Sequence, residues 1–288
     1  METTRRDFLR GWCVSGCAVL VPHPISEAKG SQTGGDGSRV PSQKTGRISS
    51  TSPIETPLAA KIKAISNVFE TGAPQTLYGY VENLGDGRGY TVTSYGFCTS
   101  TTEVSLVIEQ YSASVPTTPL KQFLPYMPPL LDDDDMERLQ GFPSAWRKES
   151  HSSAPLAAAC DAQADSLFLI PALKAAEAAK VQSPIGKSIF YDTWLQHGDG
   201  NDPDSFQAIY LSTLNRTGGR DQCSEEVFLR TFLNIRKLVL REPANSATNS
   251  LWRQSTPRVD ALVNLLEHNP NLVAPIQVIN AEVRATMF

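Results

Sequence analysis

Two carboxylic acids stand out as side chains that could carry out acid–base chemistry. Glu70 ends an apolar segment beside Val68 and Phe69, and Asp86 follows in Gly85-Asp86-Gly87-Arg88-Gly89. Apolar surroundings favour the neutral form of a carboxyl and raise its pKa, which suits a general acid. The nearby cation of Arg88 favours an ionised Asp86, which suits a general base. Glycosidases divide the two roles between such a pair of carboxyls.

Both residues also have simpler interpretations. A glutamate at a helix end is often solvated, and Gly-Asp-Gly often forms only a turn. The alternating glycines do not indicate a phosphate-binding loop, because the central Asp86 would repel phosphate. The residues that follow predict a strand, whereas the dinucleotide fingerprint needs a helix there.

Composition narrows the function classes. The chain has 288 residues, 40% of them apolar, and a net charge of -4, which fits one large domain or two lobes. The mild acidity argues against a nucleic-acid partner, which calls for a basic face. There is no HExxH, CxxC pair, Walker A or GxSxG motif. We therefore expect no metal and no organic cofactor, and chemistry that depends on carboxylates.

Residues 1–28 have the features of an export signal. Thr4-Arg5-Arg6-Asp7-Phe8-Leu9-Arg10 resembles the twin-arginine consensus, and the apolar run 11–21 is too short to span a membrane. Ser26-Glu27-Ala28 is a candidate cleavage site. Because Val14-Ser15-Gly16-Cys17 resembles a lipobox, a lipoprotein is the alternative. We expect a bacterial protein, secreted or periplasmic, without a stable membrane span.

Residues 29–57 are rich in Gly, Ser, Thr, Gln and Pro and predict a disordered linker, so the expected folded domain is 58–288. After cleavage Cys98, Cys160 and Cys223 remain. An odd number leaves at least one free thiol. A bridge between Cys160 and Cys223 could form in an oxidising compartment.

Apolar periodicity predicts a mainly helical domain. Short β-branched and aromatic strands are expected within 89–99, and the acidic run 132–135 falls in a polar stretch that reaches residue 153. The predicted helices are 58–70, 102–113, 119–131, 154–180, 184–197, 203–217, 224–241 and 257–267. The pattern favours an α+β, mainly α fold with one small sheet and a cleft between two helical lobes.

One block of residues resembles a known family. Tyr80-Val81-Glu82-Asn83-Leu84-Gly85-Asp86-Gly87-Arg88-Gly89-Tyr90-Thr91, with Gly96-Phe97-Cys98 after it, closely resembles the signature of family 46 glycoside hydrolases. That family consists of endo-acting chitosanases. Shorter matches follow in the family's order over roughly 58–275: Tyr191-Asp192, His197-Gly198, Gly200-Asn201-Asp202-Pro203, Phe232-Leu233-x-x-Arg236-Lys237 and Arg258-Val259-Asp260.

The resemblance implies a lysozyme-like, two-lobed fold and inverting hydrolysis of β-1,4 links in chitosan. It makes Glu70 the general acid and Asp86 the base that activates water, with Arg88 and Thr91 supporting Asp86 and that water. It implies sugar-binding roles for Tyr80, Gly96, Glu103 and His197. It also implies an ion-pair network behind Asp86, formed by Asp192, Arg236 and Arg258.

Several of these residues have ordinary alternatives. Thr91 could be a plain strand residue, Glu103 a solvated surface charge, and His197 a cap on helix-end carbonyls. At position 243 the family has a glutamate that joins the network, whereas this chain has Pro243, with Glu242 one residue earlier. The segment 71–79 is also shorter than the family form.

The sequence therefore predicts a monomeric endo-chitosanase whose partner is a cationic polysaccharide. A lysozyme-like hydrolase of peptidoglycan or chitin is the nearest enzymatic alternative. A catalytically silent carbohydrate-binding protein on the same fold is the alternative from another class. The presence of both Glu70 and Asp86, with Arg88 and Thr91, argues against the silent protein.

Overall fold

The computed structural model describes residues 56–288, apart from Asp86 and the segments 129–135, 245–248 and 280–283. The predicted export signal, almost all of the predicted linker and the acidic run 132–135 lie outside the described residues. The predicted base Asp86 also lies outside them.

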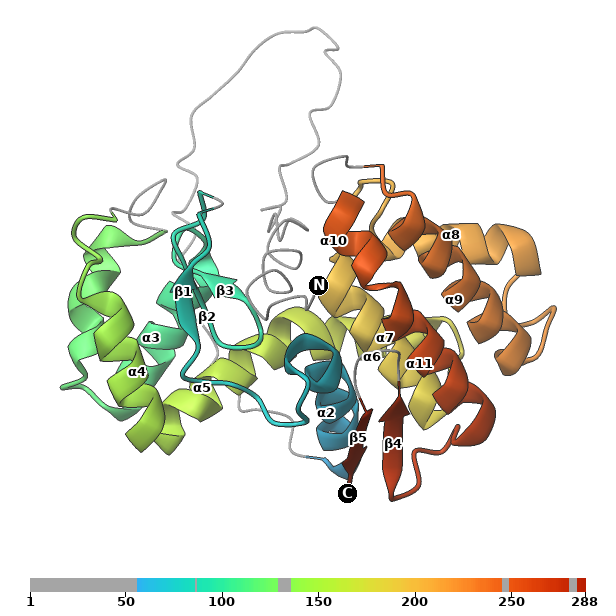
Figure 1. Ribbon diagram of the computed structural model, residues 1–288, viewed down its shortest axis with the longest axis horizontal. Helices are drawn as coiled ribbons and strands as arrows, with labels where there is room; N and C mark the ends of the chain where they lie inside the picture. Colours follow the sequence, from blue (N-terminus) through green and yellow to red (C-terminus); the bar gives the residue numbers. More distant parts are fainter. Residues whose placement is uncertain (1–55, 86, 129–135, 245–248, 280–283) are drawn as a thin grey trace, which may run out of the picture.

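The described chain is mainly helical, with two small antiparallel sheets (Figure 1). The strands are β1 (Val81–Asn83), β2 (Tyr90–Val92), β3 (Phe97–Cys98), β4 (Ile276–Ile279) and β5 (Arg284–Met287). The helices are α2 (Pro57–Thr71), α3 (Thr102–Ser114), η1 (Pro119–Tyr126), α4 (Phe142–Ser152), α5 (Ala154–Ala164), η2 (Asp165–Leu169), α6 (Ile170–Ala178), α7 (Pro184–His197), α8 (Phe206–Thr217), α9 (Glu225–Arg241), α10 (Asn249–Gln254) and α11 (Thr256–His268).

Two apolar cores define two lobes, as predicted. The sheet lobe packs β1–β3 with α3, η1, α4 and α5, and its core includes Phe97, Tyr111 and Trp146. The helical lobe packs α6, α8, α9 and α11 with β4–β5 around Phe190 and Phe232. Burial of such aromatic side chains is the main favourable term that holds each lobe together. The α+β, mainly α, two-lobed fold is confirmed.

One long helix belongs to both lobes. The run Ala154–Ala178 is the only described helix with the length and apolarity of a membrane span, and half of its most apolar window is buried in the protein. Its apolar residues are accounted for by the cores, since Leu156 packs in the sheet lobe and Ala176 in the helical lobe. The predicted helix 154–180 is interrupted by the π turn η2, in which Ile170 N–H reaches Asp165 O. Pro171 accounts for this turn, because its ring and missing N–H disturb a regular helix.

Helix α2 lies between the lobes and ends close to the predicted acid. It begins where Thr56 accepts a hydrogen bond from Ala59 N–H and Pro57 occupies the first turn. It ends at Gly72, whose φ of 75° is a left-handed conformation that favours glycine. Ile62 packs in the sheet-lobe core and Ile65 in the helical-lobe core. The helix is therefore held from both sides.

The three-stranded sheet has the order β1-β2-β3, with Glu82 opposite Thr91 and Thr91 opposite Cys98. The β1–β2 connection contains Gly85, Gly87 and Gly89, with φ of 71°, 81° and 71°. Side chains with a Cβ rarely adopt such angles, so the glycines are required by the turn. Their conformational role agrees with the rejection of a phosphate loop.

Some element predictions were wrong. The predicted helix 119–131 is a 3₁₀ helix over Pro119–Tyr126 that contains Pro125, and α8 begins at Phe206 rather than 203. The polar stretch before 153 contains α4, which buries only Phe142 and Trp146 and so has a weak apolar pattern. The β4–β5 hairpin and α10 were also missed.

The three cysteines of the described chain are free thiols. Cys160 is buried in the sheet-lobe core, and Cys223 packs against the helical-lobe core. Because the two residues belong to different lobes, the Cys160–Cys223 bridge that the sequence left open does not form.

Candidate active site

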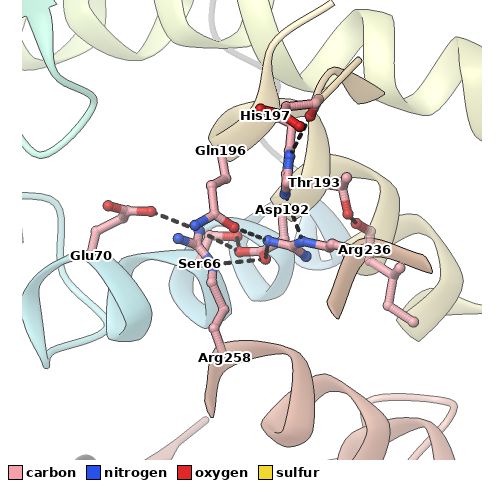
Figure 2. A network of polar contacts seen from close by, with 10 residues as sticks. Ser66, Glu70, Asp192, Thr193, Gln196, His197, Arg236 and Arg258 are labelled. Atoms are coloured by element: carbon pink, nitrogen blue, oxygen red, sulfur yellow. Dashed lines mark hydrogen bonds and ion pairs between the residues drawn. The ribbon is translucent and has the colours of Figure 1, made fainter. Parts of the chain in front are cut away.

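Glu70 is buried in the last turn of α2, with only 2% of its surface exposed. Its Oε1 lies 2.7 Å from Nη2 of Arg258, which comes from α11 (Figure 2). Neither Glu70 oxygen has a hydrogen-bond partner of good geometry among the described residues, so the contact is an ion pair only. Burial raises the pKa of Glu70, and the opposing charge of Arg258 does not cancel this effect.

Asp192 is the centre of a buried ion-pair network, which we define as Glu70, Asp192, Arg236 and Arg258. Its Oδ1 accepts from Nη2 of Arg258 at 2.7 Å, and its Oδ2 accepts from Nε of Arg258 at 2.8 Å. Nη2 of Arg236 lies 2.8 Å from Oδ2, and the Ser66 hydroxyl donates to Oδ1 at 2.8 Å. Burial works against ionisation, but the two guanidinium groups lower the pKa of Asp192 to about 2.

Arg236 links Asp192 to the end of α7 (Figure 2). The residue is fully buried on α9, and burial lowers its pKa to about 10. Its Nη2 donates to Oε1 of Gln196 at 2.6 Å, and its Nε donates to Nε2 of His197 at 3.3 Å. Nη1 of Arg236 is buried without a described hydrogen-bond partner.

His197 uses both ring nitrogens inside the protein. Nδ1 donates to the carbonyl of Asp204 at 2.7 Å while Nε2 accepts from Arg236, which fits a neutral ring. Burial and the charge of Arg236 lower the pKa of His197 well below its usual range. The ring also packs edge-on against Trp252. The Asp204 carbonyl precedes the start of α8 and is not a helix-end carbonyl, so this bond is not the expected cap, and neither ring nitrogen is left for a sugar hydroxyl.

The other predicted residues lie in the sheet lobe. Thr91 is fully buried on β2, with its hydroxyl 3.6 Å from Sγ of Cys98. Gly96 lies in the turn before β3 with a φ of 74°. The Tyr80 hydroxyl donates to Glu82 at 3.2 Å, and both residues line a cavity of about 590 Å³ between β1 and α4.

Glu103 is not the solvated surface charge that the sequence allowed. It is 3% exposed in the first turn of α3, and its Oε2 has no hydrogen-bond partner among the described residues. Burial raises its pKa, while the Thr101 hydroxyl and the charge of half-buried Arg88 act in the opposite direction. Glu103 and Arg88 are therefore electrostatic neighbours on the sheet side.

The predicted residues thus fall into two groups. Glu70, Asp192, Arg236, Arg258 and His197 share one buried set of contacts. The resemblance implied an ion-pair network behind Asp86. Among the described residues, the network contacts Glu70 through Arg258. The family's fourth network member, a glutamate at position 243, has no replacement in the described part of the chain. Glu242 does not join the network, because it is exposed at the end of α9.

Sequence reasoning missed three residues of this region. Ser66 lies one helical turn before Glu70 on the buried face of α2, and that spacing was a usable signal. Gln196 precedes His197, and Trp252 lies on a helix that was not predicted. Their contacts with Arg236 and His197 join elements far apart in sequence, which periodicity alone does not reveal.

Comparison with known proteins agrees with this arrangement. A family model described as glycosyl hydrolase family 46 matches residues 64–276. A curated chitosanase from Bacillus subtilis (strain 168) is 40% identical over 223 residues, which cover 76% of this chain and 80% of that protein. The chain belongs to glycoside hydrolase family 46. A chitosanase from Streptomyces sp. (strain N174) is 29% identical over 198 residues, 68% of this chain and 70% of that protein.

Solved structures of family 46 enzymes have the same fold. The native chitosanase of Bacillus subtilis MY002 matches with a TM-score of 0.72 and 38% identity, over 80% of this chain and 98% of that chain. A glutamate-to-alanine mutant of that enzyme, complexed with 6 GlcN, matches with a TM-score of 0.71 and 37% identity, over 80% and 97%. A Gynuella sunshinyii family 46 chitosanase in complex with chitotetraose has a TM-score of 0.72 and 34% identity, over 81% and 98%.

The network predicts a large effect of Asp192→Asn. The change leaves two buried guanidinium groups without their anion, so we expect the free energy of unfolding at pH 7 to fall by about 3–5 kcal/mol. Asp192 has a lowered pKa, so its contribution is present above pH 3.8 and is lost as the pH falls through about 2. Urea unfolding between pH 7 and pH 2 should show the two proteins converging in acid.

Asp260→Asn is the matched control. Asp260 pairs with Lys237 at the surface, and an exposed pair contributes less than about 1 kcal/mol. Equal losses of stability in the Asp192 and Asp260 variants would contradict the buried network.

Proposed function

We propose that this family 46 member is an endo-acting chitosanase that hydrolyses β-1,4-glycosidic bonds with inversion. The observation that carries the proposal is Glu70, a buried carboxyl with a raised pKa beside the cation of Arg258. The curated relatives are chitosanases, and similar structures hold 6 GlcN and chitotetraose. These findings favour chitosan over peptidoglycan or chitin.

Glu70 is suited to donate a proton to the leaving glycosidic oxygen. Its raised pKa keeps the carboxyl protonated at a pH where an exposed glutamate would be ionised. Proton transfer leaves a buried carboxylate, and Arg258 is 2.7 Å away to stabilise it. With Glu70 protonated, the network holds two cations and the single anion Asp192. When Glu70 donates its proton, the network holds two cations and two anions, so its charges balance.

The second half of the proposal assigns the base to Asp86, which lies outside the described residues. In an inverting reaction a water molecule enters opposite the leaving group, between two carboxyls roughly 6.5–9.5 Å apart. Asp86 would take a proton from this water as it attacks the anomeric carbon. The proposed supporting residues are Arg88 and Thr91; Thr91 is fully buried on strand β2, which follows the connection that contains Asp86.

The charge of chitosan also supports it as the substrate. Chitosan amines are protonated in mild acid, so the polymer is a polycation, and the chain carries a net charge of -4. Glu103, Tyr80 and Gly96 are the proposed sugar-binding residues of the sheet lobe. The proposed sugar contact of His197 is with a ring carbon, since both nitrogens are engaged within the protein.

Glu70→Gln tests the acid directly. The amide keeps the shape of the side chain but donates no proton to the leaving group. We expect kcat on highly deacetylated chitosan to fall by about 10²–10⁴-fold, the range for loss of a general acid. Viscosity loss and released reducing ends, measured on residues 29–288, report endo-hydrolysis.

Glu109→Gln serves as the matched control, because Glu109 is an exposed glutamate on α3. It should leave kcat within about twofold, as expected of a surface substitution. A folded parent that cleaves peptidoglycan or chitin but not chitosan would favour the alternative hydrolase. Binding of chitosan without cleavage by the parent would favour the silent carbohydrate-binding protein.

Inversion has its own test. Single displacement by water at a β-linkage releases a reducing end in the α configuration. Proton NMR of freshly cleaved oligosaccharide, recorded before mutarotation, should show the α anomer first. An initial excess of the β anomer would overturn the inverting mechanism while leaving the chitosanase activity in place.

We further propose that the protein is exported in a folded state by the twin-arginine route and acts outside the cytoplasm as a monomer. The support is the sequence Arg5-Arg6-Asp7-Phe8-Leu9 before a short apolar run, together with the size of a polymeric substrate. A single chain carries every predicted catalytic and binding residue, so the proposed chemistry needs no second copy.

The paired arginines make export testable. Replacing Arg5 and Arg6 with lysine in the full chain should retain active enzyme inside a twin-arginine-competent bacterial host, because receptors read this pair. Chitosanase activity is measured in the medium, the periplasm and the cytoplasm. Unchanged export of the double variant would contradict the route, and retention on the membrane through Cys17 would support the lipoprotein alternative.

A further inference from the structure

A tyrosine–aspartate cluster, formed by Asp161, Tyr78 and Tyr95, lies outside the ion-pair network. Asp161 is on α5. Tyr78 Oη donates to its Oδ2 at 2.8 Å, and Tyr95 Oη donates to its Oδ1 at 2.6 Å. Tyr78 belongs to the segment between Glu70 and β1, and Tyr95 belongs to the turn between β2 and β3. One carboxylate therefore ties two separate pieces of the sheet lobe to the helix shared by both lobes.

The tyrosine–aspartate cluster is largely buried, and both of its tyrosine hydroxyls are donors. Tyr95 is 2% exposed, and Tyr78 and Asp161 are half-buried. Burial and the neighbouring charge of Asp161 raise the pKa of both tyrosines, so both hydroxyls remain donors. Hydrogen bonds to an ionised acceptor are shorter and stronger than neutral ones, in agreement with the 2.6 Å distance.

Hydrogen bonds extend from the cluster to the helix turn that carries Glu70. Thr76 Oγ1 lies 3.3 Å from Tyr95 Oη, and Asn67 Nδ2 donates to Thr76 Oγ1 at 3.2 Å. Because Tyr95 already donates to Asp161, Thr76 is the donor to Tyr95. Asn67 is on α2, three residues before Glu70, and also donates to the carbonyl of Pro74. The bonds run in one direction, from Asn67 through Thr76 and Tyr95 to Asp161.

The sheet side of the segment is fixed by further contacts. The Leu77 N–H donates to Ser94 Oγ at 3.1 Å, and Trp146 Nε1 donates to the Tyr78 carbonyl at 2.8 Å. Arg147 Nη2 donates to the Val81 carbonyl at 2.7 Å. The segment that is shorter than the family form is thus attached to α2, α4, α5 and the sheet.

We propose that Asp161 is a positioning residue that sets the separation between Glu70 and the β1–β2 sheet. This inference rests on the proposed function, because it is in inverting hydrolysis that the carboxyl spacing must admit one water. Glu70 ends α2, and Asp86 belongs to the β1–β2 connection, so no single element holds both. Asp161 joins the two from a third element. It acts through Tyr78 and Tyr95 and does not itself react.

Asp161→Asn and Tyr95→Phe test the proposal. The first removes the charge of the acceptor, and the second removes one buried donor. A misplacement of about 1 Å can lower a rate by about 10²-fold, so we expect kcat on chitosan to fall by about 10–100-fold. KM should change less than about threefold, because neither change removes a predicted sugar contact.

Tyr111→Phe is the matched control. Tyr111 is also 2% exposed in the sheet lobe, and its hydroxyl donates to Glu149 Oε2 at 2.7 Å. It therefore loses a comparable tyrosine–carboxylate bond that is not joined to the cluster. Thermal unfolding of all three variants gives the loss of stability, and kinetics are measured well below each Tm.

A fall in kcat for Asp161→Asn and Tyr95→Phe, with Tyr111→Phe within about twofold at a similar loss of Tm, supports positioning. Equal kcat in all three variants, or a fall in kcat that follows Tm in all three, overturns it.

Amide hydrogen exchange tests the anchoring role of Asp161 independently of chitosan cleavage. Asp161→Asn should speed exchange in residues 72–80 and 93–97, whatever the substrate of the enzyme. Unchanged exchange there overturns the anchoring role even if chitosan is cleaved. A parent that does not cleave chitosan overturns the proposed function, and faster exchange in the variant would then still support Asp161 as the anchor of this segment.

Discussion

The rest of the site depends on the ion pairs that the Arg258 guanidinium makes with Glu70 and Asp192. This guanidinium contacts two buried carboxyls at once, and their environments shift their pKa values in opposite directions. Asp192 receives several charge-assisted bonds and stays ionised, whereas Glu70 receives one ion pair that burial outweighs. Three helices must meet for this to happen, since Glu70 is on α2, Asp192 on α7 and Arg258 on α11 (Figure 2).

The same contact explains why charged residues are tolerated inside the protein. An isolated buried ion is strongly unfavourable, but Asp192 and the two arginines satisfy most of one another's bonding capacity. Glu70 is then the carboxyl of the network whose pKa is raised, which favours its neutral form. A general acid needs such a site, in which both protonation states are held without rearrangement. The fold therefore holds a buried ionisable carboxyl, Glu70, beside a fixed cation.

Local signals predicted the parts of this site that depend on neighbours in sequence. The apolar period of α2 placed Glu70 at a buried helix end, and its raised pKa followed from that position. The glycine-rich turn before β2 was also predicted from residue types. The pairing of Arg258 with Glu70, both bonds of His197 and the role of Asp161 were not predicted, because each joins elements that only tertiary packing brings together. Helix α4 was missed because its apolar stripe is narrow, and the π turn because Pro171 acts only within a continuous helix.

The helix Ala154–Ala178 is more than a connection between the lobes, because each lobe builds part of its core on it. Two lobes joined by a linker can rotate freely, whereas two lobes moulded on one helix can move only by deforming it. Such deformation would concentrate at the π turn, where the regular hydrogen-bond ladder is already broken. The shared helix therefore limits how far the spacing between the two lobes can change.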